Sequence, residues 1–258
     1  MTDTQALLSR AENDGERLLL RHVRDLALRV EDGSAVCTTA FLTPSEQALL
    51  RSCERHIGCG MTFFGGYDGA DRSILALHPP AAPPDGAALP VSAVRLSHKA
   101  PLTHRDILGS MLALGIKRET LGDILVSEGR SIVILLSGIL PFILDSCKKA
   151  GRTPVETAEV PLSEISPPEQ KFEIIRATLQ SLRLDAVISS GFGISRESAK
   201  EAIASGLVRL NYRETDSPSK QLGEGCVLSL RGKGKIVVGE IGGRSKKDRI
   251  WVTLKRYL

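Results

Sequence analysis

The chain has 258 residues, and its 34 Lys and Arg against 30 Asp and Glu give a formal net charge of +4 at pH 7. This length allows two or three small domains. The five cysteines, an odd number, exclude the fully paired disulfide framework of small secreted proteins. The longest apolar run, 132–144, is interrupted by Ser137, Gly138 and Pro141 and is too short to span a bilayer. With no signal peptide at the N-terminus, the sequence predicts a cytoplasmic protein without membrane contact.

The positive charge is concentrated near the C-terminus. Residues 181–258 hold 15 Lys and Arg against 8 Asp and Glu, a net of +7, which leaves 19 against 22, a net of −3, in the rest of the chain. A basic surface confined to one part of a chain is typical of nucleic-acid binding. We therefore expect the last third to carry the main contact surface.

The first part of the chain, 1–80, is predicted to be an α/β domain. Leucine and valine recur between charged residues over 4–30 and predict one long helix. A second helix is predicted from Thr43, which can cap it together with Glu46, while Pro44 suits the first helical turn.

Cys53, His56 and Cys59 have a Cys-x-x-His-x-x-Cys spacing that a metal site could use, with Cys37 or His78 completing the set. A structural zinc site usually shows a second tight pair of ligands, and this sequence has none. We therefore predict buried thiols, with no metal and no cofactor.

Residues 61–72 combine aromatic residues, glycines and an acidic turn before a predicted strand at 73–78. The favoured interpretation is strand–turn–strand, in which the glycines supply backbone angles. The alternative is a loop that faces RNA or a partner. The Pro- and Ala-rich segment 79–90 is the best candidate domain boundary.

Residues 90–165 are predicted to form a small split-βαβ domain similar to an RNA recognition motif (RRM). The predicted order is a strand at 91–96, a helix opened by Thr103, strands at 121–126 and 131–136, a helix at 140–150 and a strand at 155–162. The paired aromatics that an RRM uses for stacking are missing, so we do not expect this sheet to read single strands. Lys117 and Arg118, on a tight turn, are better contact candidates, although a solvated turn explains them equally well.

Residues 182–235 contain two helical patterns, a short strand, a turn-rich loop, and a strand at 227–230 that runs into a basic glycine ribbon. Ser195 is predicted to cap the second helix. Arg196 and Lys200 lie four residues apart, so they project from one face. The repulsion between these two like charges slightly destabilises the helix. A sequence tolerates this cost readily if an anion binds across the pair.

In the glycine ribbon, Arg231, Lys233 and Lys235 alternate with two glycines. Glycine lets the backbone approach a ligand closely, and cations beside it favour phosphate. The alternative for the whole stretch is an ordinary α+β module with a solvated basic face.

The order of these features resembles the RNA-binding domain named after ribosomal small-subunit protein four, also called the alpha-L motif. The matching positions are Arg183-Leu-Asp185, Gly191, Ser195-Arg196, Ala199, Ile203, Gly206, Val208, Asn211, Pro218-Ser219, Gly223, Gly225 and Arg231-Gly-Lys-Gly234. The family often has Asn-Gly at its hairpin, where this chain has Asn211-Tyr212. We therefore expect a differently built turn and a Tyr212 side chain that can stack on a base or ribose.

This domain is predicted to span 181–258 and to bind RNA mainly by shape. The helix from Ser195 would present Arg196 and Lys200 to a phosphate backbone, and its N-terminus would add backbone donors. The predicted RNA contacts are Arg183, Ser195, Arg196, Lys200, Arg209, Asn211, Tyr212, Arg213, Arg231, Lys233 and Lys235, with Lys117 and Arg118 from the central domain.

Nearly the whole chain resembles the YlmH-type bacterial and plastid RNA-binding proteins. The matching strings are Phe41-Leu-Thr-Pro-x-Glu46, Phe63-Phe-Gly-Gly-Tyr67, Ala70-Asp-Arg72, Leu102-Thr-His-Arg-Asp-Ile-Leu-Gly109, Leu114-Gly-Ile-Lys-Arg118, Gly122-Asp-Ile124, Val160-Pro-Leu162 and the C-terminal module. The resemblance implies three small α+β domains: an N-terminal α/β domain, a central RRM-like domain and a C-terminal alpha-L domain. It also implies binding to ribosomal RNA or tRNA on the large ribosomal subunit, in the rescue of stalled subunits.

Several enzyme classes carry an alpha-L module, and each needs further sequence features. A pseudouridine synthase needs a catalytic domain, usually after the module, yet here the module comes last. Neither the cofactor turn of a methyltransferase nor a complete synthetase ATP motif is present. We therefore predict a non-catalytic, monomeric RNA-binding protein without a small-molecule substrate. The alternatives are an adaptor in cell division or in plastid-type photosystem regulation, or an accessory of an RNA-modifying enzyme.

Overall fold

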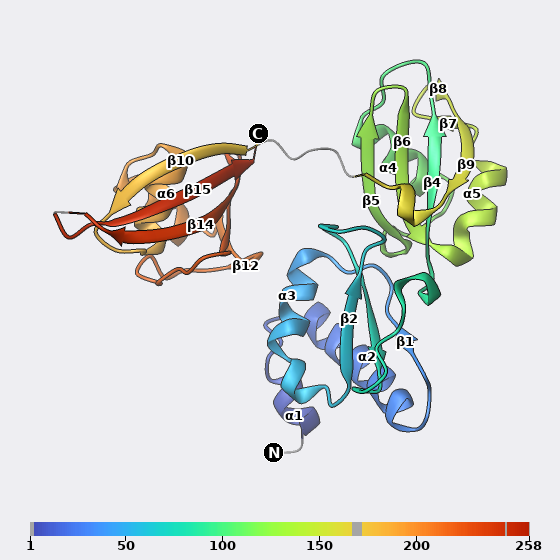
Figure 1. Cartoon of the computed structure of the whole chain (residues 1–258), viewed down its shortest axis with the longest axis horizontal. Coiled ribbons are helices and arrows are strands. Elements are labelled where there is room, and N and C mark those ends of the chain that lie inside the picture. Colours follow the sequence, from blue (N-terminus) through green and yellow to red (C-terminus); the bar gives the residue numbers. More distant parts are fainter. Residues whose placement is uncertain (1–2, 167–171, 246, 258) are drawn as a thin grey trace. The chain divides into compact units, whose positions relative to one another are not determined.

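The computed structural model describes residues 3–166, 172–245 and 247–257 of the chain (Figure 1). Contacts within the chain divide it into two compact units, Met1–Pro168 and Glu169–Leu258. Within the described ranges, no helix combines the length and the apolar character needed to cross a bilayer.

The N-terminal half of the first unit packs helices on a small antiparallel sheet. Its elements are α1 (Asp3–Leu8), α2 (Asp14–Glu31), β1 (Cys37–Thr38), α3 (Pro44–Ser52), β2 (Gly60–Phe64) and β3 (Ile74–His78), with strand order β1-β3-β2. The helices α2 and α3 bury their apolar faces with β3 in one core, as the alternation of leucine with charged residues predicts.

The single helix predicted over 4–30 is wrong, because the chain forms two helices there. Asn13 takes an extended conformation and its side chain accepts a hydrogen bond from the backbone N–H of Glu16, so α2 begins afresh at Asp14. The start of α3 is confirmed as predicted. Thr43 Oγ1 accepts from Glu46 N at 3.3 Å, and Thr43 N donates to Glu46 Oε2 at 2.6 Å.

The central half has the predicted split-βαβ order. It consists of β4 (Val91–Ser97), α4 (His104–Ala113), β5 (Leu121–Ser127), β6 (Arg130–Leu136), α5 (Leu140–Ser146) and β9 (Glu156–Val160), with a small hairpin of β7 (Lys149–Ala150) and β8 (Thr153–Pro154). The main sheet has the antiparallel order β5-β6-β4-β9. The helix predicted over 140–150 ends early, since residues 149–150 pair with β8 instead. Short 3-10 helices lie at Glu54–His56, Gly86–Ala88, Arg118–Thr120, Ser137–Ile139 and Leu162–Glu164.

The two halves of the first unit share a layer of buried side chains. Phe41 and Ile74 from the N-terminal half pack in one apolar cluster with Val91, Ala93 and Ile134 from β4 and β6. Part of the sheet surface that an RRM would use for bases is therefore covered by protein. Residues 79–90 lie within the first compact unit. That they separate two domains able to fold independently stays a prediction.

The predicted strand–turn–strand element at 61–78 is confirmed, and its turn serves this junction. Tyr67 Oη donates to Asp123 Oδ2 at 2.7 Å, and the backbone N–H groups of Asp71 and Arg72 donate to the same carboxylate. Burial, together with the Asp123 carboxylate, raises the pKa of Tyr67. A Cβ at Gly65 would lie 2.6 Å from the carbonyl oxygen of Arg72, so the turn requires glycine there. The turn therefore connects the N-terminal half to β5 of the central half through Asp123.

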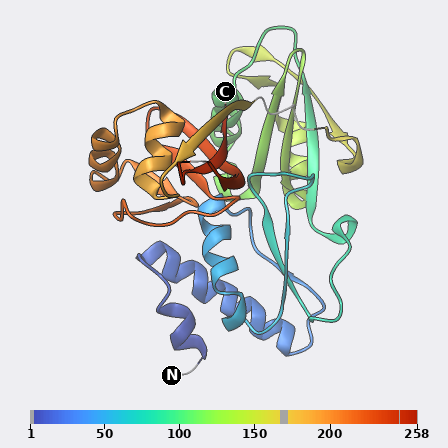
Figure 2. The same cartoon turned by 60° about the vertical axis from the view of Figure 1, so that its left-hand side comes forward.

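The C-terminal unit is a twisted antiparallel sheet with two helices on one side (Figures 1 and 2). Its elements are β10 (Phe172–Leu179), α6 (Leu184–Phe192), α7 (Arg196–Ala204), β11 (Val208–Leu210), β12 (Arg213–Glu214), β13 (Val227–Leu230), β14 (Gly234–Arg244) and β15 (Ile250–Tyr257), in the strand order β10-β15-β14-β13-β11-β12. The buried faces of both helices pack on the inner side of the sheet. Ala199 and Ile203 are buried, as their helical spacing predicts.

Candidate nucleic-acid interface

A buried carboxylate links the first turns of α6 and α7. The Asp185 side chain is fully buried and accepts from Arg183 Nε at 3.1 Å and Arg183 Nη2 at 3.3 Å. Arg196 Nη2 reaches the same carboxylate at 3.4 Å from the next helix. The two arginine side chains remain 33% and 49% exposed. One carboxylate thus fixes two guanidinium groups at the surface, and each of these has five N–H donors.

The charge state of this cluster follows from competing effects on the pKa of Asp185. Burial alone would raise that pKa, but the hydrogen bonds from Arg183 and Arg196 and their positive charges lower it by more. Asp185 therefore stays ionised at neutral pH. One negative charge against two positive charges leaves the cluster with a net charge of +1.

Helix α7 presents its N-terminus and one basic face beside this cluster. Ser195 caps the helix as predicted, and its Oγ accepts from Ser198 N at 3.0 Å. Lys200 is exposed one turn after Arg196. For Arg196, the anion predicted to lie across the pair is supplied by the protein itself, as Asp185.

A basic hollow adjoins this surface. It has a volume of about 740 Å³ and lies between the edge strand β10, helix α6 and the hairpin that joins β14 to β15. Its lining residues are Arg176, Ala177, Thr178, Leu179, Gln180, Ser181, Ala186, Ser189, Ser190, Arg196, Lys247 and Arg249. They include four cations and no carboxylate, which suits a phosphate group. The sequence predictions include only Arg196 of these residues.

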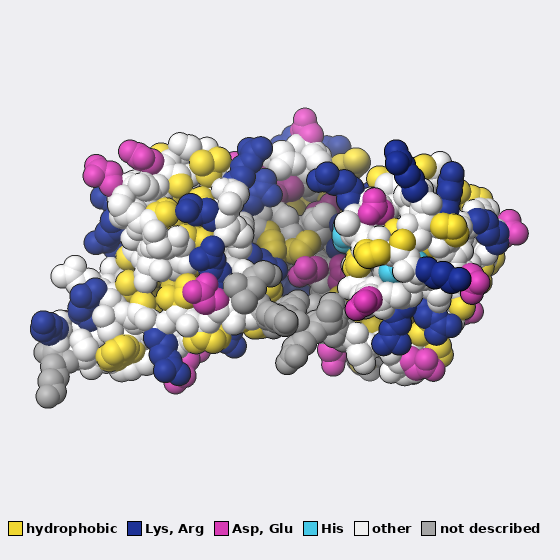
Figure 3. All heavy atoms as spheres, turned by 90° about the horizontal axis from the view of Figure 1, so that it is seen from above, with side chains coloured by type: hydrophobic (Ala, Val, Ile, Leu, Met, Phe, Trp, Pro, Cys, Tyr) yellow, Lys and Arg dark blue, Asp and Glu magenta, His cyan; other side chains and the backbone are white. Residues whose placement is uncertain are grey.

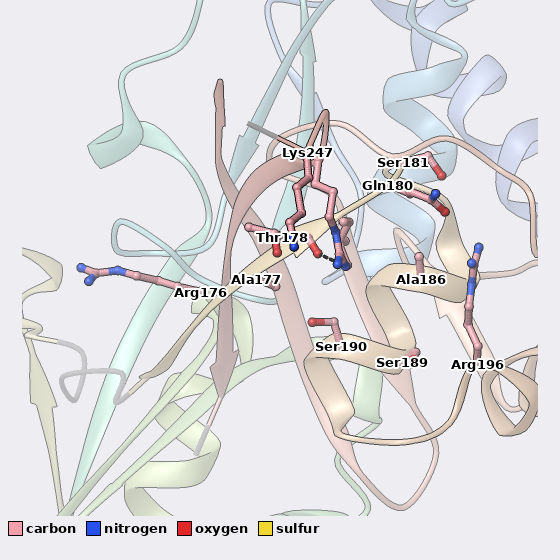
Figure 4. Close-up of a pocket in the computed structure, with 12 residues that line it drawn as sticks. Arg176, Ala177, Thr178, Gln180, Ser181, Ala186, Ser189, Ser190, Arg196 and Lys247 are labelled. Atoms are coloured by element: carbon pink, nitrogen blue, oxygen red, sulfur yellow. Dashed lines mark hydrogen bonds between the residues drawn. The ribbon is translucent and has the colours of Figure 1, made fainter. Parts of the chain in front are cut away.

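A hydrogen bond from a side chain to the backbone joins two of the elements that line the hollow. Arg249 Nη2 donates to the carbonyl oxygen of Thr178 at 2.6 Å, which ties the hairpin to β10. In Figure 4, Lys247 extends toward Thr178 while Arg196 rises from the start of α7, and Arg176 points away from both. The signal that could have revealed this site is the run 244–249, where four of six residues are basic.

The turn at Asn211-Tyr212 corrects a prediction. Asn211 has φ of 48° and Tyr212 has φ of 67°, and the flanking residues Leu210 and Arg213 pair across the hairpin. Two central residues with positive φ are what a type I′ turn requires. The turn is therefore built as Asn-Gly would build it, and Tyr212 takes the conformation that glycine normally takes. Asn211 Oδ1 also accepts from Val227 N at 2.9 Å, which anchors the turn to β13.

Replacing Tyr212 by glycine is expected to raise the free energy of unfolding by about 1 kcal/mol, because a left-handed conformation costs other residues about that much. Urea denaturation of the full chain measures the change. The control is Tyr212→Ala, which removes the same side chain but keeps the backbone strain. Equal stability of the glycine and alanine variants would show that the turn is unstrained.

The remaining predicted contacts of the C-terminal unit lie on its strands and turns. Arg209 is exposed and pairs at 3.6 Å with the equally exposed Glu214, and Arg213 is half-buried beside it. Such surface pairs contribute little to stability. Arg231 and Lys233 are exposed in the turn between β13 and β14. Both side chains are accessible to solvent, and their contact with RNA stays a prediction.

Lys235 is arranged differently from its neighbours in the glycine ribbon. Its Nζ lies 4.1 Å from the centroid of the Tyr257 ring, on the side of the sheet away from the helices. The predicted ribbon of three cations is thus divided between the turn and the outer sheet face. On the visible face of this unit in Figure 3, Lys and Arg side chains are more prominent than Asp and Glu, in line with its net positive charge.

Two regions of the chain match known domain families. Residues 91–164 match the family described as "Putative RNA-binding domain in YlmH", and residues 182–228 match the S4 domain. Over 244 residues the chain is 32% identical to "Ribosome-associated protein quality control protein P2" of Bacillus subtilis (strain 168), covering 93% of this chain and 95% of that protein. The chain belongs to the YlmH family. Both resemblances found in the sequence are confirmed, as is the multi-domain α+β fold class.

A solved structure supports the same family. The structure titled "Cell division protein ylmH from Streptococcus pneumoniae" is similar with a TM-score of 0.54 and 25% sequence identity, and the match covers 60% of this chain and 96% of that chain.

In this YlmH-family chain, the two predicted contacts of the central half differ in exposure. Lys117 is exposed. Arg118 is partly buried, and its Nη1 donates to the carbonyl oxygens of Leu121 at 2.8 Å and Gly122 at 3.3 Å. Part of its hydrogen-bonding capacity therefore holds the turn before β5 in place, and Lys117 is the better placed of the two for RNA.

The spacing of Cys53, His56 and Cys59 does not assemble a metal site in the described parts of the YlmH-family chain, where no group of three or more His, Cys, Asp or Glu side chains could hold an ion. Cys53 is buried in the N-terminal core as predicted, whereas Cys59 is only partly buried at its edge, and both are free thiols. His78 instead bonds to Thr62 Oγ1 at 3.0 Å and to the carbonyl oxygen of Pro79 at 2.8 Å.

Proposed function

We propose that this protein binds structured ribosomal RNA, and tRNA held beside it, on the large ribosomal subunit, as a non-catalytic factor in ribosome-associated quality control. The observation that carries the proposal is the surface formed by Arg183, Arg196 and Lys200 next to a hollow lined by further cations. The name of the Bacillus subtilis relative supports the ribosomal setting.

The surface has the chemistry that a phosphate backbone requires. The Asp185 carboxylate orients Arg183 and Arg196, and both side chains retain exposed donors. Because they are already ordered, they lose little conformational entropy when they bind an anion. Phosphate contacts set the register of a protein on RNA but carry no sequence information. Recognition would therefore follow the shape of a folded RNA, in which the deep major groove is closed to side chains.

Sedimentation of cell lysate through sucrose gradients tests this proposal. The native protein is expected to travel with the large subunit at low and moderate salt, and the variant with Arg196→Ala and Lys200→Ala is expected to stay near the top. The matched control is Arg21→Ala with Arg29→Ala, which removes two exposed cations from α2, outside both matched domains, and should leave sedimentation unchanged. If the native protein also stays near the top, the ribosomal role is wrong, and a role as a protein adaptor becomes the leading alternative.

A further inference from the structure

The sheet of the C-terminal unit has a second face that its helices do not use. Side chains of a strand point alternately to opposite faces, and the inward set, which includes Ile236, Val252 and Leu254, is buried against α6 and α7. Figure 1 shows β10, β15 and β14 in front of α6, with this second face toward the viewer. Among the residues described in this unit, no helix lies over it.

Aromatic side chains occupy this outer face. The Trp251 side chain is 51% exposed. Phe172 and Tyr257, which are paired across β10 and β15, meet edge to face with ring centroids 4.8 Å apart. A Cβ at Gly242 would lie 3.2 Å from Trp251 Cβ, so glycine at that position leaves the flank of the indole uncovered on the β14 side.

Cations surround these rings. Arg176 and Lys255 are exposed and point to the same face as Trp251, according to strand alternation and register. Lys235 lies over the ring of Tyr257. Glu240 lines a small pocket together with Arg176 and Trp251, and it is the one carboxylate among the lining residues of that pocket. Three cations against this one carboxylate favour a polyanion over a basic or neutral partner.

The outer face adjoins the basic hollow. Arg176 lines the hollow and also lies beside Trp251, and β10 is the edge strand that separates the two. A nucleic-acid strand that leaves the hollow along β10 would therefore reach the aromatic face within a few nucleotides.

We propose that the outer face of this sheet stacks unpaired nucleotides of the bound RNA, with Trp251 as the principal platform and Arg176 and Lys255 on the phosphates. Aromatic platforms with neighbouring cations bind single strands with little regard for sequence, because every base has a flat apolar face. The proposal rests on the proposed function, since it assigns a second contact surface to the same RNA. It also supplies a stacking surface that the central sheet lacks.

Fluorescence gives a direct test, because Trp251 is the only tryptophan in the chain. The full-length protein is titrated with an unstructured oligouridylate of about twelve nucleotides, and in parallel with a labelled RNA hairpin followed by anisotropy. Stacking is expected to quench the tryptophan emission with the same midpoint as oligouridylate binding. Trp251→Ala should weaken oligouridylate binding roughly tenfold and leave hairpin binding unchanged. Trp251→Phe should retain most of the oligouridylate affinity.

The variant with Arg196→Ala and Lys200→Ala provides the opposite control. It should weaken hairpin binding while the quenching of Trp251 by oligouridylate persists. Binding of both RNAs without any change in tryptophan emission would overturn the stacking face and leave the proposed function intact. Failure of both RNAs to bind would overturn both proposals. If Trp251→Ala lowers ribosome association without affecting either RNA, the face docks a protein, and the proposal is also wrong.

Discussion

Replacing Asp185 by asparagine is expected to lower the free energy of unfolding by about 3 kcal/mol, the lower end of the range for breaking a buried ion pair. The change keeps the volume of the side chain but leaves Arg183 and Arg196 without their shared carboxylate. Since both guanidinium groups are partly exposed, water can compensate for some of the loss. Chemical denaturation of the full-length protein measures the effect on the transition of the C-terminal unit.

The control for this substitution is Asp216→Asn, which removes an exposed carboxylate from a loop of the same unit and should change stability by less than about 0.5 kcal/mol. Equal effects of the two variants would show that the cluster around Asp185 does not stabilise the fold.

The same carboxylate predicts how stability depends on pH. The pKa of Asp185 is lower in the folded protein than in the unfolded chain, so its contribution is fully present above the unfolded pKa of about 3.9. That contribution is lost as the pH falls through the folded pKa. The stability difference between the native protein and Asp185→Asn should therefore be constant near neutral pH and shrink below about pH 4. A difference that persists undiminished in acid would contradict the pKa shift.

The features that the sequence predicts well are those set by neighbouring residues. The cap of α3 by Thr43 and Glu46, and the cap of α7 by Ser195, depend on residues three apart. The missed break before α2 belongs to the same class, because Asn13 and Glu16 have the same spacing. That error could have been avoided from the sequence.

The features that the sequence does not predict depend on distant residues. Strand β10 pairs with β15, which lies at the other end of the unit in sequence, so that Phe172 is opposite Tyr257. Register shifts interrupt the pairing of β14 with β15 and weaken the alternation of buried and exposed side chains along β14. The hollow is assembled from β10, from the start of α7 and from the hairpin near Lys247. The periodicity of neighbouring residues does not show that these three distant segments meet in space.

The site shows the same division between local and distant causes. Arg183 and Asp185 form part of a sequence motif, but the sequence does not show that the Arg196 side chain contacts Asp185. The prediction of a differently built turn at Tyr212 is also wrong, because the pairing of Leu210 with Arg213 imposes positive φ on both central residues whatever their side chains. The predicted contacts therefore include Arg196 and Lys200 of α7 but not Asp185, the carboxylate that orients Arg196.

The salt dependence of RNA binding decides whether the hollow and α7 bind the same RNA. Each phosphate contact contributes about 0.7 to 0.9 to the slope of log affinity against log salt concentration. Replacing Arg196 and Lys200 by alanine should thus lower the slope by about 1.4 to 1.8, and adding Lys247→Ala should lower it further, to a total of about 2.1 to 2.7. Anisotropy with a structured ribosomal RNA fragment at several salt concentrations gives these slopes.

Lys247 is a better probe of the hollow than Arg249. The Arg249 side chain also bonds to the carbonyl oxygen of Thr178, so replacing Arg249 would disturb the fold. A triple variant with the slope of the double variant would show that the RNA does not enter the hollow, and α7 would then act alone. An additional decrease for Lys247→Ala, with stability unchanged, is expected instead, since Arg196, Lys247 and Arg249 line the hollow without a carboxylate and repel one another unless an anion occupies it.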